Sequence, residues 1–507
     1  MGLDAALNIA AGSLANINRQ IALVSQNVAN ASTPNYAREV STQQSVSAGG
    51  IGMGVLSGPA QRSVDAVLQA STLTQNATVA GLTTQQTALQ AIDTELGTPG
   101  QGTDLASRLG SLQDAFTTLA DDPQSATQQQ AVVSAASTLA GSIRSLSGVY
   151  TTQRQGAQDA IVSDVASLNA AFDSVGSLTT QIMNLKAAGQ STADLENQRD
   201  ASVQTISQMV SVKTLEQANG NMVLVLGSGL SPPLSMKDPF SASGATIGAS
   251  STYPGGGIPG IMLGGADVTT QLSGGQIGAN IALRDSTLPT GQAALDEFAH
   301  GLATRFDAQG LTLFTDPAGN LASGGGSPVQ AGYVGFSSTI TVNPAVVAAP
   351  STVRDGTRAV AGSVTGASAF TPNPSTGPAG FTGLLSRVLD YTFGSEAQTG
   401  VAQPSLNVAG LGAGGTLSSP YPGSGSLATL VSSMVGAQSQ RSADTTSSLS
   451  AEQAMQTTLQ NKVSATDGVS IDTEMSTMVQ LQNAYGASAR IISAAQTMWN
   501  QLLTTVQ

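Results

Sequence analysis

The segment 471–507, IDTEMSTMVQLQNAYGASARIISAAQTMWNQLLTTVQ, decides how the rest of this chain is organised. Apolar residues recur in it every seventh position, and a further apolar or small residue follows three places after most of them. The repeat consists of Ile471, Met478, Leu481, Tyr485, Ile492, Trp499, Leu502 and Val506. Alternating steps of three and four residues are typical of a coiled-coil helix. From Met475 onward the only charged side chain is Arg490, so the helix is expected to bury its stripe against a partner.

The N-terminal segment has the same spacing and is the expected partner. Its repeat consists of Leu3, Leu7, Leu14, Ile17, Ile21, Val24 and Val28. We therefore predict two terminal helices that meet in space, with the rest of the chain looped out between them. These two stripes form the predicted assembly interface. The alternative is a pair of amphipathic helices that pack on one globular core.

Composition excludes several classes of function. The chain has 507 residues, a net charge of −13 and only 18 basic residues, which disfavours binding to nucleic acid or to an anionic membrane surface. No run of 18 apolar residues is present, so no membrane span is predicted. Cysteine is absent and His300 is the only histidine, so no metal site and no cofactor are expected. The N-terminus also lacks the basic start and continuous apolar run of a cleaved secretion signal.

The pattern along the chain predicts an α+β multidomain protein, a nested rod with paired terminal coiled-coil helices, a helical bundle and an outer β-rich domain. Residues 1–60 form the N-terminal axial helix and an extended segment, and helical spacing over 61–210 gives the first part of the bundle. The Asn219-Gly220 hairpin signal opens a β-rich domain over 211–425, which contains one helical island near 288–306. Residues 426–465 complete the bundle, and 466–507 form the C-terminal axial helix.

Two features could suggest enzyme chemistry. The carboxylates of residues 194–200 are dense enough for acid–base catalysis, but they also open a helix, where negative charge suits the helix dipole. His300 lies on the polar face of an amphipathic segment. We interpret both features as structural and predict no catalytic residue.

The segment ALNIAAGSLANINRQIALVSQNVANASTPNYAREV resembles the N-terminal segment of bacterial flagellar rod, hook and hook–filament junction proteins. The specific part is the turn motif after the helix, made of Asn30, Thr33, Pro34, Asn35 and Tyr36. Asn35 stands where the family often has Gly, and both residues tolerate positive φ. Three further stretches, DLENQRDASVQTISQMVSV, LSGGQIGANIALRDSTLPTGQAALDEFAHGLATRFDAQG and the closing helix, resemble the FlgK family of hook-associated proteins.

This resemblance implies a non-enzymatic, structural protein of the bacterial flagellum that serves motility. It would leave the cell through type III export and lie in the extracellular flagellum, at the hook–filament junction. It would self-assemble as a ring of copies through its terminal helices. The hook protein would lie below the ring and a second junction protein or the filament above it, and an export chaperone would bind the C-terminal helix.

Three alternatives stay open at this point. A hook or distal-rod axial protein shares the terminal segments, but such proteins are mostly β outside them, whereas residues 61–210 are helical. A secreted surface adhesin with a helical stalk belongs to another class and normally carries a signal peptide or an anchor. A glycoside hydrolase that uses the carboxylates of residues 194–200 is the third.

Overall fold

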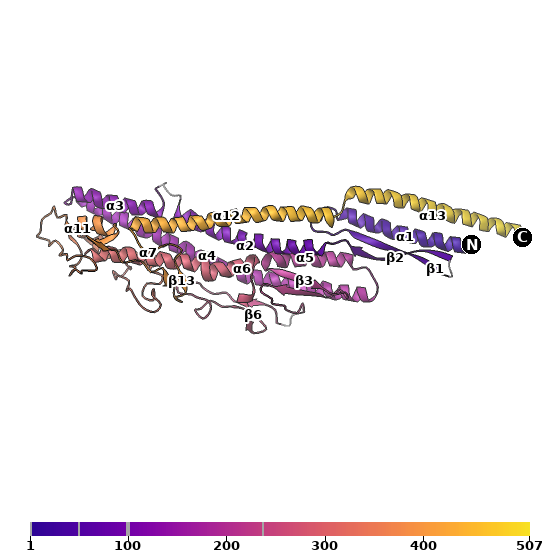
Figure 1. Cartoon of the computed structure of the whole chain (residues 1–507), viewed down its shortest axis with the longest axis horizontal. Coiled ribbons are helices and arrows are strands. Elements are labelled where there is room, and N and C mark those ends of the chain that lie inside the picture. Colours follow the sequence, from indigo (N-terminus) through magenta and orange to yellow (C-terminus); the bar gives the residue numbers. More distant parts are fainter. Residues whose placement is uncertain (1–2, 49–50, 98–101, 236–237, 507) are drawn as a thin grey trace.

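The computed structural model describes residues 3–48, 51–97, 102–235 and 238–506, which form an elongated rod (Figure 1). Both chain termini lie at one end of the rod. At that end stand α1 (Leu3–Ala29), the hairpin β1 (Glu39–Ala48) and β2 (Ile51–Arg62), and α13 (Ile471–Val506). We call these four elements the terminal module.

Five long helices form the body of the rod. They are α2 (Ala66–Leu96), α3 (Leu105–Asp121), α4 (Ala126–Ala187), α5 (Ala193–Met209) and α12 (Leu427–Thr466). Side-chain caps fix where they begin, because an oxygen at the N-cap accepts a free backbone N–H of the first turn. Asp65 caps α2 in this way, and Ser125 and Ser426 cap α4 and α12.

The region 211–425 differs from the sequence expectation. The Asn-Gly turn does join a hairpin, β3 (Val212–Glu216) with β4 (Met222–Leu226). The other strands of this region have two or three residues each, and no sheet in the described part of the chain has more than three strands. They are β5 (Ser241–Ala242), β6 (Ile261–Leu263), β7 (Ala266–Asp267), β8 (Phe314–Thr315), β9 (Thr341–Val342), β10 (Glu396–Gln398), β11 (Val401–Ala402), β12 (Ala409–Leu411) and β13 (Leu417–Ser418).

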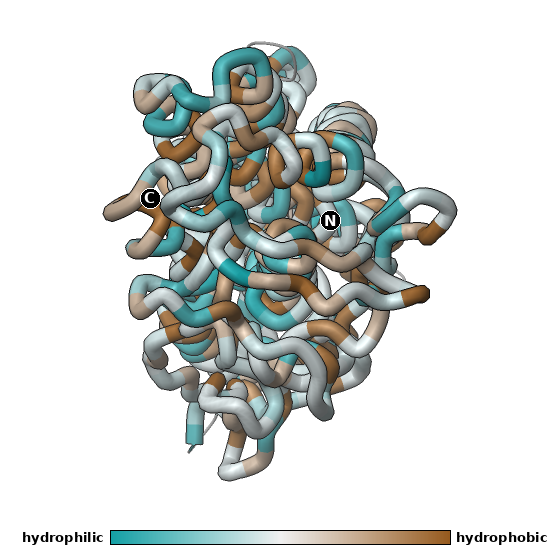
Figure 2. Tube along the Cα trace, turned by 90° about the vertical axis from the view of Figure 1, so that its left-hand side faces the viewer, coloured by the Kyte–Doolittle hydropathy of each residue, from teal (hydrophilic) through white to brown (hydrophobic). Residues whose placement is uncertain are grey.

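Helices are also more numerous in this region than predicted. The helical island is α7 (Leu288–Ala308), which continues from α6 (Gly275–Ala282) through a π-helical turn, Leu283–Thr287. Four short helices follow: α8 (Phe336–Thr339), α9 (Pro344–Ala348), α10 (Thr352–Asp355) and α11 (Gly383–Arg387). The prediction of a β-rich domain with one helical island was therefore wrong. Seen from the end away from the termini, irregular loops cover the helices (Figure 2).

Buried side chains, rather than strand ladders, satisfy the backbone of these loops. The Arg154 guanidinium on α4 donates to the carbonyl oxygens of Arg284 (3.1 Å), Gly248 (3.1 Å) and Ser251 (2.9 Å). On α7, the Asp296 carboxylate accepts from the backbone N–H of Gly335 at 2.8 Å. Because each buried backbone group needs a partner, these side chains allow an irregular path that a Gly- and Ser-rich sequence cannot specify by pattern.

Two separate hydrophobic cores lie along the rod. The distal core, away from the termini, joins α3, α7 and the first parts of α4 and α12, with Phe116 and Phe306 rings 5.8 Å apart. The proximal core joins α5, α6, the second part of α4 and the β3–β4 hairpin, with Phe172 and Phe240 rings 6.0 Å apart. The terminal module adds only a small cluster of its own, centred on Leu481.

A chain cut to residues 64–466 should fold without the terminal module, because both large cores lie inside these bounds. We expect cooperative thermal unfolding with the helical circular-dichroism signal kept. The full-length chain is the control and should melt within a few degrees of the shortened one. A shortened chain that melts without a transition would contradict this division.

Candidate functional site

Helices α1 and α13 lie side by side in opposite directions, with both chain ends at the same tip (Figure 1). Every seventh residue of α13 forms a buried ladder against α1: Glu474, Leu481, Ser488 and Ala495. The matching ladder on α1 consists of Ala10, Ile17 and Val24. Where the Ser13 and Ser488 hydroxyls meet at 3.4 Å, the facing residues are small, so the two helices can approach closely.

Some residues of the predicted interface meet within the chain and others do not. Ile17, Val24 and Leu481 form the buried cluster, with Ile21 and Met478 packed beside it. Leu7, Leu14, Val28 and Ile492 are half-buried. Ile471, Tyr485 and Trp499 stay 52%, 42% and 46% exposed, because the neighbouring ladder faces α1 instead. The side chains of Leu3, Leu502 and Val506 lie outside the described part of the structure.

Helix α13 carries an exposed apolar surface that its own chain leaves uncovered. We call this the apolar flank of α13. Its members are Ile471, Met475, Val479, Tyr485, Ile491, Met498, Trp499 and Leu503, each between 42% and 56% exposed. Heptad geometry places Met475 and Trp499 on one side of the buried ladder and Ile491 and Met498 on the other. Of this set, the sequence prediction missed Met475, Val479, Ile491, Met498 and Leu503, since it counted only the two strongest heptad positions.

The turn motif joins α1 to the hairpin. The Asn27 side-chain amide pairs with the backbone of Glu39, donating to its carbonyl oxygen (2.9 Å) and accepting from its N–H (3.0 Å). The Tyr36 hydroxyl donates to the Asn27 amide oxygen at 3.3 Å. Asn35 has φ of 61°, as the sequence predicts, and lets the chain reverse after Pro34.

The first part of the same motif stabilises the end of α1. The Asn30 side chain donates to the carbonyl oxygen of Gln26 (3.1 Å) and accepts from the Thr33 hydroxyl (3.2 Å). These bonds satisfy groups that a helix end leaves free. The five motif residues are therefore arranged around one change of direction.

The carboxylates of residues 194–200 connect the terminal module to the bundle. Arg62 of β2 forms ion pairs with Glu196 (3.0 Å) and Asp200 of α5, and Lys186 of α4 reaches Glu196 at 3.0 Å. Asn197 donates to the carbonyl oxygen of Ala37 at 3.2 Å. Glu196 and Asp200 are thus paired with neighbours of opposite charge, which supports the structural interpretation.

A second set of contacts attaches α13 and the end of α12. Arg38 forms an ion pair with Glu474 of α13. The carbonyl oxygen of Asp467 accepts from the Arg38 N–H (2.7 Å), and its carboxylate accepts from the Asp65 N–H (3.0 Å). We call this set of contacts the joint. Its residues are Asn27, Tyr36, Arg38, Glu39, Arg62, Asp65, Glu196, Asn197, Asp200, Asp467 and Glu474. It brings together α1, β1, β2, α5, α12 and α13.

Burial sets the charge state of the joint. Burial, reinforced by the negative charge of Asp194, raises the pKa of the Glu39 carboxyl. Burial also raises the pKa of Asp467. For Glu196, burial acts in the same direction, but hydrogen bonds from Lys186 and Thr192 outweigh it and lower its pKa. Burial thus disfavours the ionised forms of Glu39 and Asp467, whereas its hydrogen bonds favour ionised Glu196.

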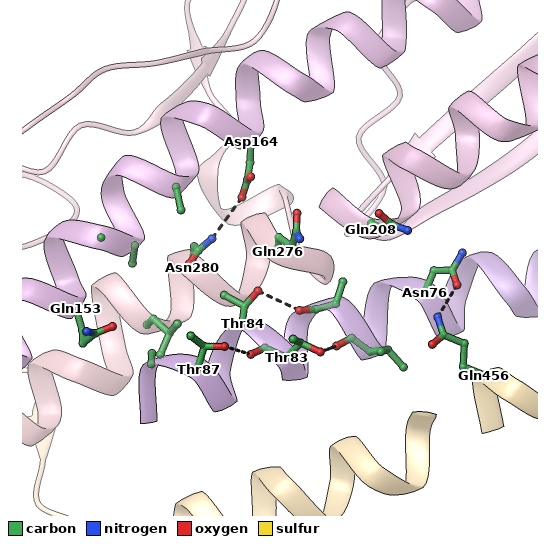
Figure 3. A pocket seen from close by; sticks show the side chains of 17 residues that line it. Asn76, Thr83, Thr84, Thr87, Gln153, Asp164, Gln208, Gln276, Asn280 and Gln456 are labelled. Carbon is green, nitrogen blue, oxygen red and sulfur yellow. Dashed lines mark hydrogen bonds between the residues drawn. The ribbon is translucent and has the colours of Figure 1, made fainter. Parts of the chain in front are cut away.

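Two further polar sites in the described part of the chain are occupied by neighbouring side chains. His300 stacks on Tyr333 with ring centroids 4.0 Å apart, and burial lowers its pKa. A groove of about 500 Å³ between α2, α4 and α6 is lined by amides and hydroxyls, and its one carboxylate, Asp164, is bonded to Asn280 at 3.4 Å (Figure 3). In the described ranges no three metal-binding side chains gather, and no helix is long and apolar enough to cross a membrane.

Comparison with known proteins gives two family matches. The sequence model described as the flagellar hook-associated protein FlgK helical domain matches residues 89–321. The model described as the flagellar basal body rod FlgEFG protein C-terminal matches residues 464–505. The flagellar hook-associated protein 1 of Salmonella typhimurium and that of Salmonella typhi are each 30% identical over 220 residues, 41% of this chain and 38% of the relative.

These matches support a relationship to the FlgK family over residues 89–321. This family consists of structural flagellar proteins and not of enzymes. The matched segment 89–321 includes most of the helical bundle that distinguished the FlgK resemblance from hook and rod proteins. The chain spans about 38% of the length of the curated relatives it matches. The flagellar hook junction protein FlgK from Burkholderia pseudomallei, a solved structure, is 24% identical over 51% of this chain and 46% of its own, with a TM-score of 0.39.

Replacing the central amide of the joint should loosen the terminal module. Asn27→Ala leaves the buried Glu39 N–H without a partner, at a cost of about 1–3 kcal/mol. We expect faster amide hydrogen exchange in α1 and β1 and unchanged exchange in α4. Asn30→Ala is the matched control, because it removes bonds only at the partly exposed helix end. Equal exchange in the two variants would mean that the Asn27 pairing does not hold the joint.

Proposed function

We propose that this chain is an axial structural protein of the bacterial flagellum that forms the junction between hook and filament by self-assembly through its terminal helices. The observation that carries this proposal is the apolar flank of α13. Single exposed apolar residues are ordinary on a protein surface, but eight large ones on one 36-residue helix form a surface that calls for a partner.

The flank has enough apolar surface to drive association. Covering one half-exposed side chain of this size stabilises a complex by roughly 1 kcal/mol. Arg490 is the only charged residue from Met475 to the end of the helix, so burial of α13 leaves few charges to desolvate. A second copy of the same helix pair is the partner that offers the matching uncharged surface.

Paired coiled-coil terminal helices within a nested rod are the part of the fold on which this proposal depends. The antiparallel contact of α1 with α13 and the seven-residue ladders support it. The predicted interface residues then divide into two groups. Leu481, Ile17 and Val24 hold the two helices of one copy together, whereas Ile471, Tyr485 and Trp499 are free to contact the next copy.

The remaining partners follow from the family rather than from this geometry. We propose that the hook protein lies below the ring and a second junction protein or the filament above it. We also propose type III export to an extracellular flagellar location, with an export chaperone on α13 before assembly. The exposed flank supports the chaperone, because an uncovered apolar helix would otherwise associate inside the cell.

A hook or distal-rod protein is the second candidate. The match of the rod-protein model to residues 464–505 favours it, since that segment is shared among axial proteins. The helical-domain match over residues 89–321 favours the hook-associated class more strongly. A surface adhesin has no observation in its favour beyond the rod shape.

Assembly through the apolar flank can be tested by introducing one carboxylate on each side of the buried ladder of α13. Met475→Asp and Ile491→Asp leave α1 contacts intact, so the free chain should keep its helical signal and its melting temperature. In the assembled ring a buried unpaired carboxylate costs several kcal/mol. We expect cells with either variant to build hooks, to lose filaments and to release flagellin into the medium.

The matched control is Asn483→Asp, which puts the same charge on the polar side of α13. It should reduce swimming less than the flank variants do. Ile492→Asp, at a half-buried seam position, should also disturb the α1–α13 pair in the free chain. Normal swimming of both flank variants would refute assembly through this surface.

A further inference from the structure

The groove between α2, α4 and α6 coincides with the boundary between the two cores of the rod. On α4 the last distal-core residue is Ala157 and the first proximal-core residue is Ile161. On α2 the interval runs from Leu73 in the proximal core to Ala88 in the distal core. The groove, with a volume of about 500 Å³, lies across these intervals and is lined by residues from Asn76 to Ala88 on α2 and from Gln153 to Asp164 on α4.

Helix α6 is interrupted at the same level. Ile277 belongs to the proximal core and Leu283 to the distal core, and Leu283 also begins the π-helical turn. Asn280 lies between them and lines the groove (Figure 3). Such turns change the helical hydrogen-bond pattern locally, so the α6–α7 segment is not one regular rod across the boundary.

Most of the groove lining consists of small or polar side chains, with Val79 and Leu283 as the larger apolar members. From α2 come Ala80, Thr83 and Thr84, and from α4 come Gly156 and Ala160. A Cβ added to Gly156 would meet no atom within 4 Å. Open space therefore lies beside α4 at Gly156, whereas α2 and α6 approach closely at Gly81, where an added Cβ would lie 3.2 Å from the Gly275 carbonyl oxygen.

Helix α12 crosses the boundary through polar contacts. Its first part, up to Val435, belongs to the distal core, and from there to Thr466 the only buried apolar residue is Leu449. Along this stretch α12 is bonded to α2 through amides, such as Gln456 to Asn76 at 2.9 Å (Figure 3). The Gln86–Thr446 contact is exposed and the Gln456–Asn76 contact is partly buried. Such hydrogen bonds have a modest net stabilisation, because water can replace a partner, so they resist small shifts less than apolar packing does.

We propose that the rod bends at this groove, with the distal and proximal cores moving as two bodies about the small-residue segments of α2 and α4. Bending toward the groove narrows it and expels water, and bending away widens it. The long helices remain intact in both directions, because the change is spread over several turns. Helix α12 accommodates the change by shifting its polar contacts with α2. This inference concerns the free chain and does not depend on the assembly proposal.

The absence of cysteine makes the test direct, because spin labels attach only at introduced cysteines. Thr117→Cys on α3 and Ala201→Cys on α5 place one exposed label on each body. Thr117→Cys with Ser145→Cys places both labels on the distal body. This control pair gives the width of the distance distribution that arises from label flexibility alone. Pulsed electron double resonance on the full chain should give a distance distribution for the first pair at least twice as wide as for the second.

Filling the groove should remove the motion. Ala80→Leu with Ala160→Leu adds apolar side chains to both walls. We expect the distance distribution between the labels at positions 117 and 201 to narrow to the width found for positions 117 and 145, with an unchanged or higher melting temperature. Ala166→Leu with Ala170→Leu, on the exposed face of α4, is the matched control and should leave the distribution wide. If the groove is unfilled and the distance distribution for labels at 117 and 201 is as narrow as that for 117 and 145, the proposal is overturned. This result does not require the filled variant to fold. A filled variant that folds and stays wide would overturn it as well.

Discussion

The pairing of the Asn27 amide with the backbone of Glu39 is the interaction on which the arrangement of the terminal module depends. It ends α1, starts β1 and fixes the angle between them with two hydrogen bonds in a buried site. The ion pairs of Arg62 and Arg38 then attach the same point to α5 and to α13. Because the terminal module has only a small apolar cluster of its own, its orientation relative to the bundle rests on these polar contacts.

The division between polar joint and apolar cores follows from what each part has to do. The distal and proximal cores are large and closed, so the bundle is stable by burial alone. Helix α13 instead keeps eight large apolar side chains on the outside. The large cores are thus concentrated in the middle of the chain, and the exposed apolar flank lies at its C-terminal end.

Sequence periodicity predicted the long elements and both heptad positions of the α13 seam, but not which of the two faces α1. The position with the larger side chains, Ile471, Tyr485 and Trp499, stays exposed, and the position with Leu481, Ser488 and Ala495 is buried. Ser488 and Ala495 face α1 because small residues permit close approach of two helices, and a hydrophobicity count gives little weight to such residues. The short strands and helices of 211–425 were unpredictable for another reason. Their paths depend on long-range bonds from Arg154 and Asp296, which leave no local pattern.

The position of Trp499 has a spectroscopic consequence. It is the only tryptophan of the chain, and 46% of its surface is exposed on the apolar flank of α13. Its fluorescence therefore reports on that flank alone, without interference from either core. Contact with any partner that excludes water there would shift its emission to shorter wavelength, so the unlabelled chain carries its own optical probe of association.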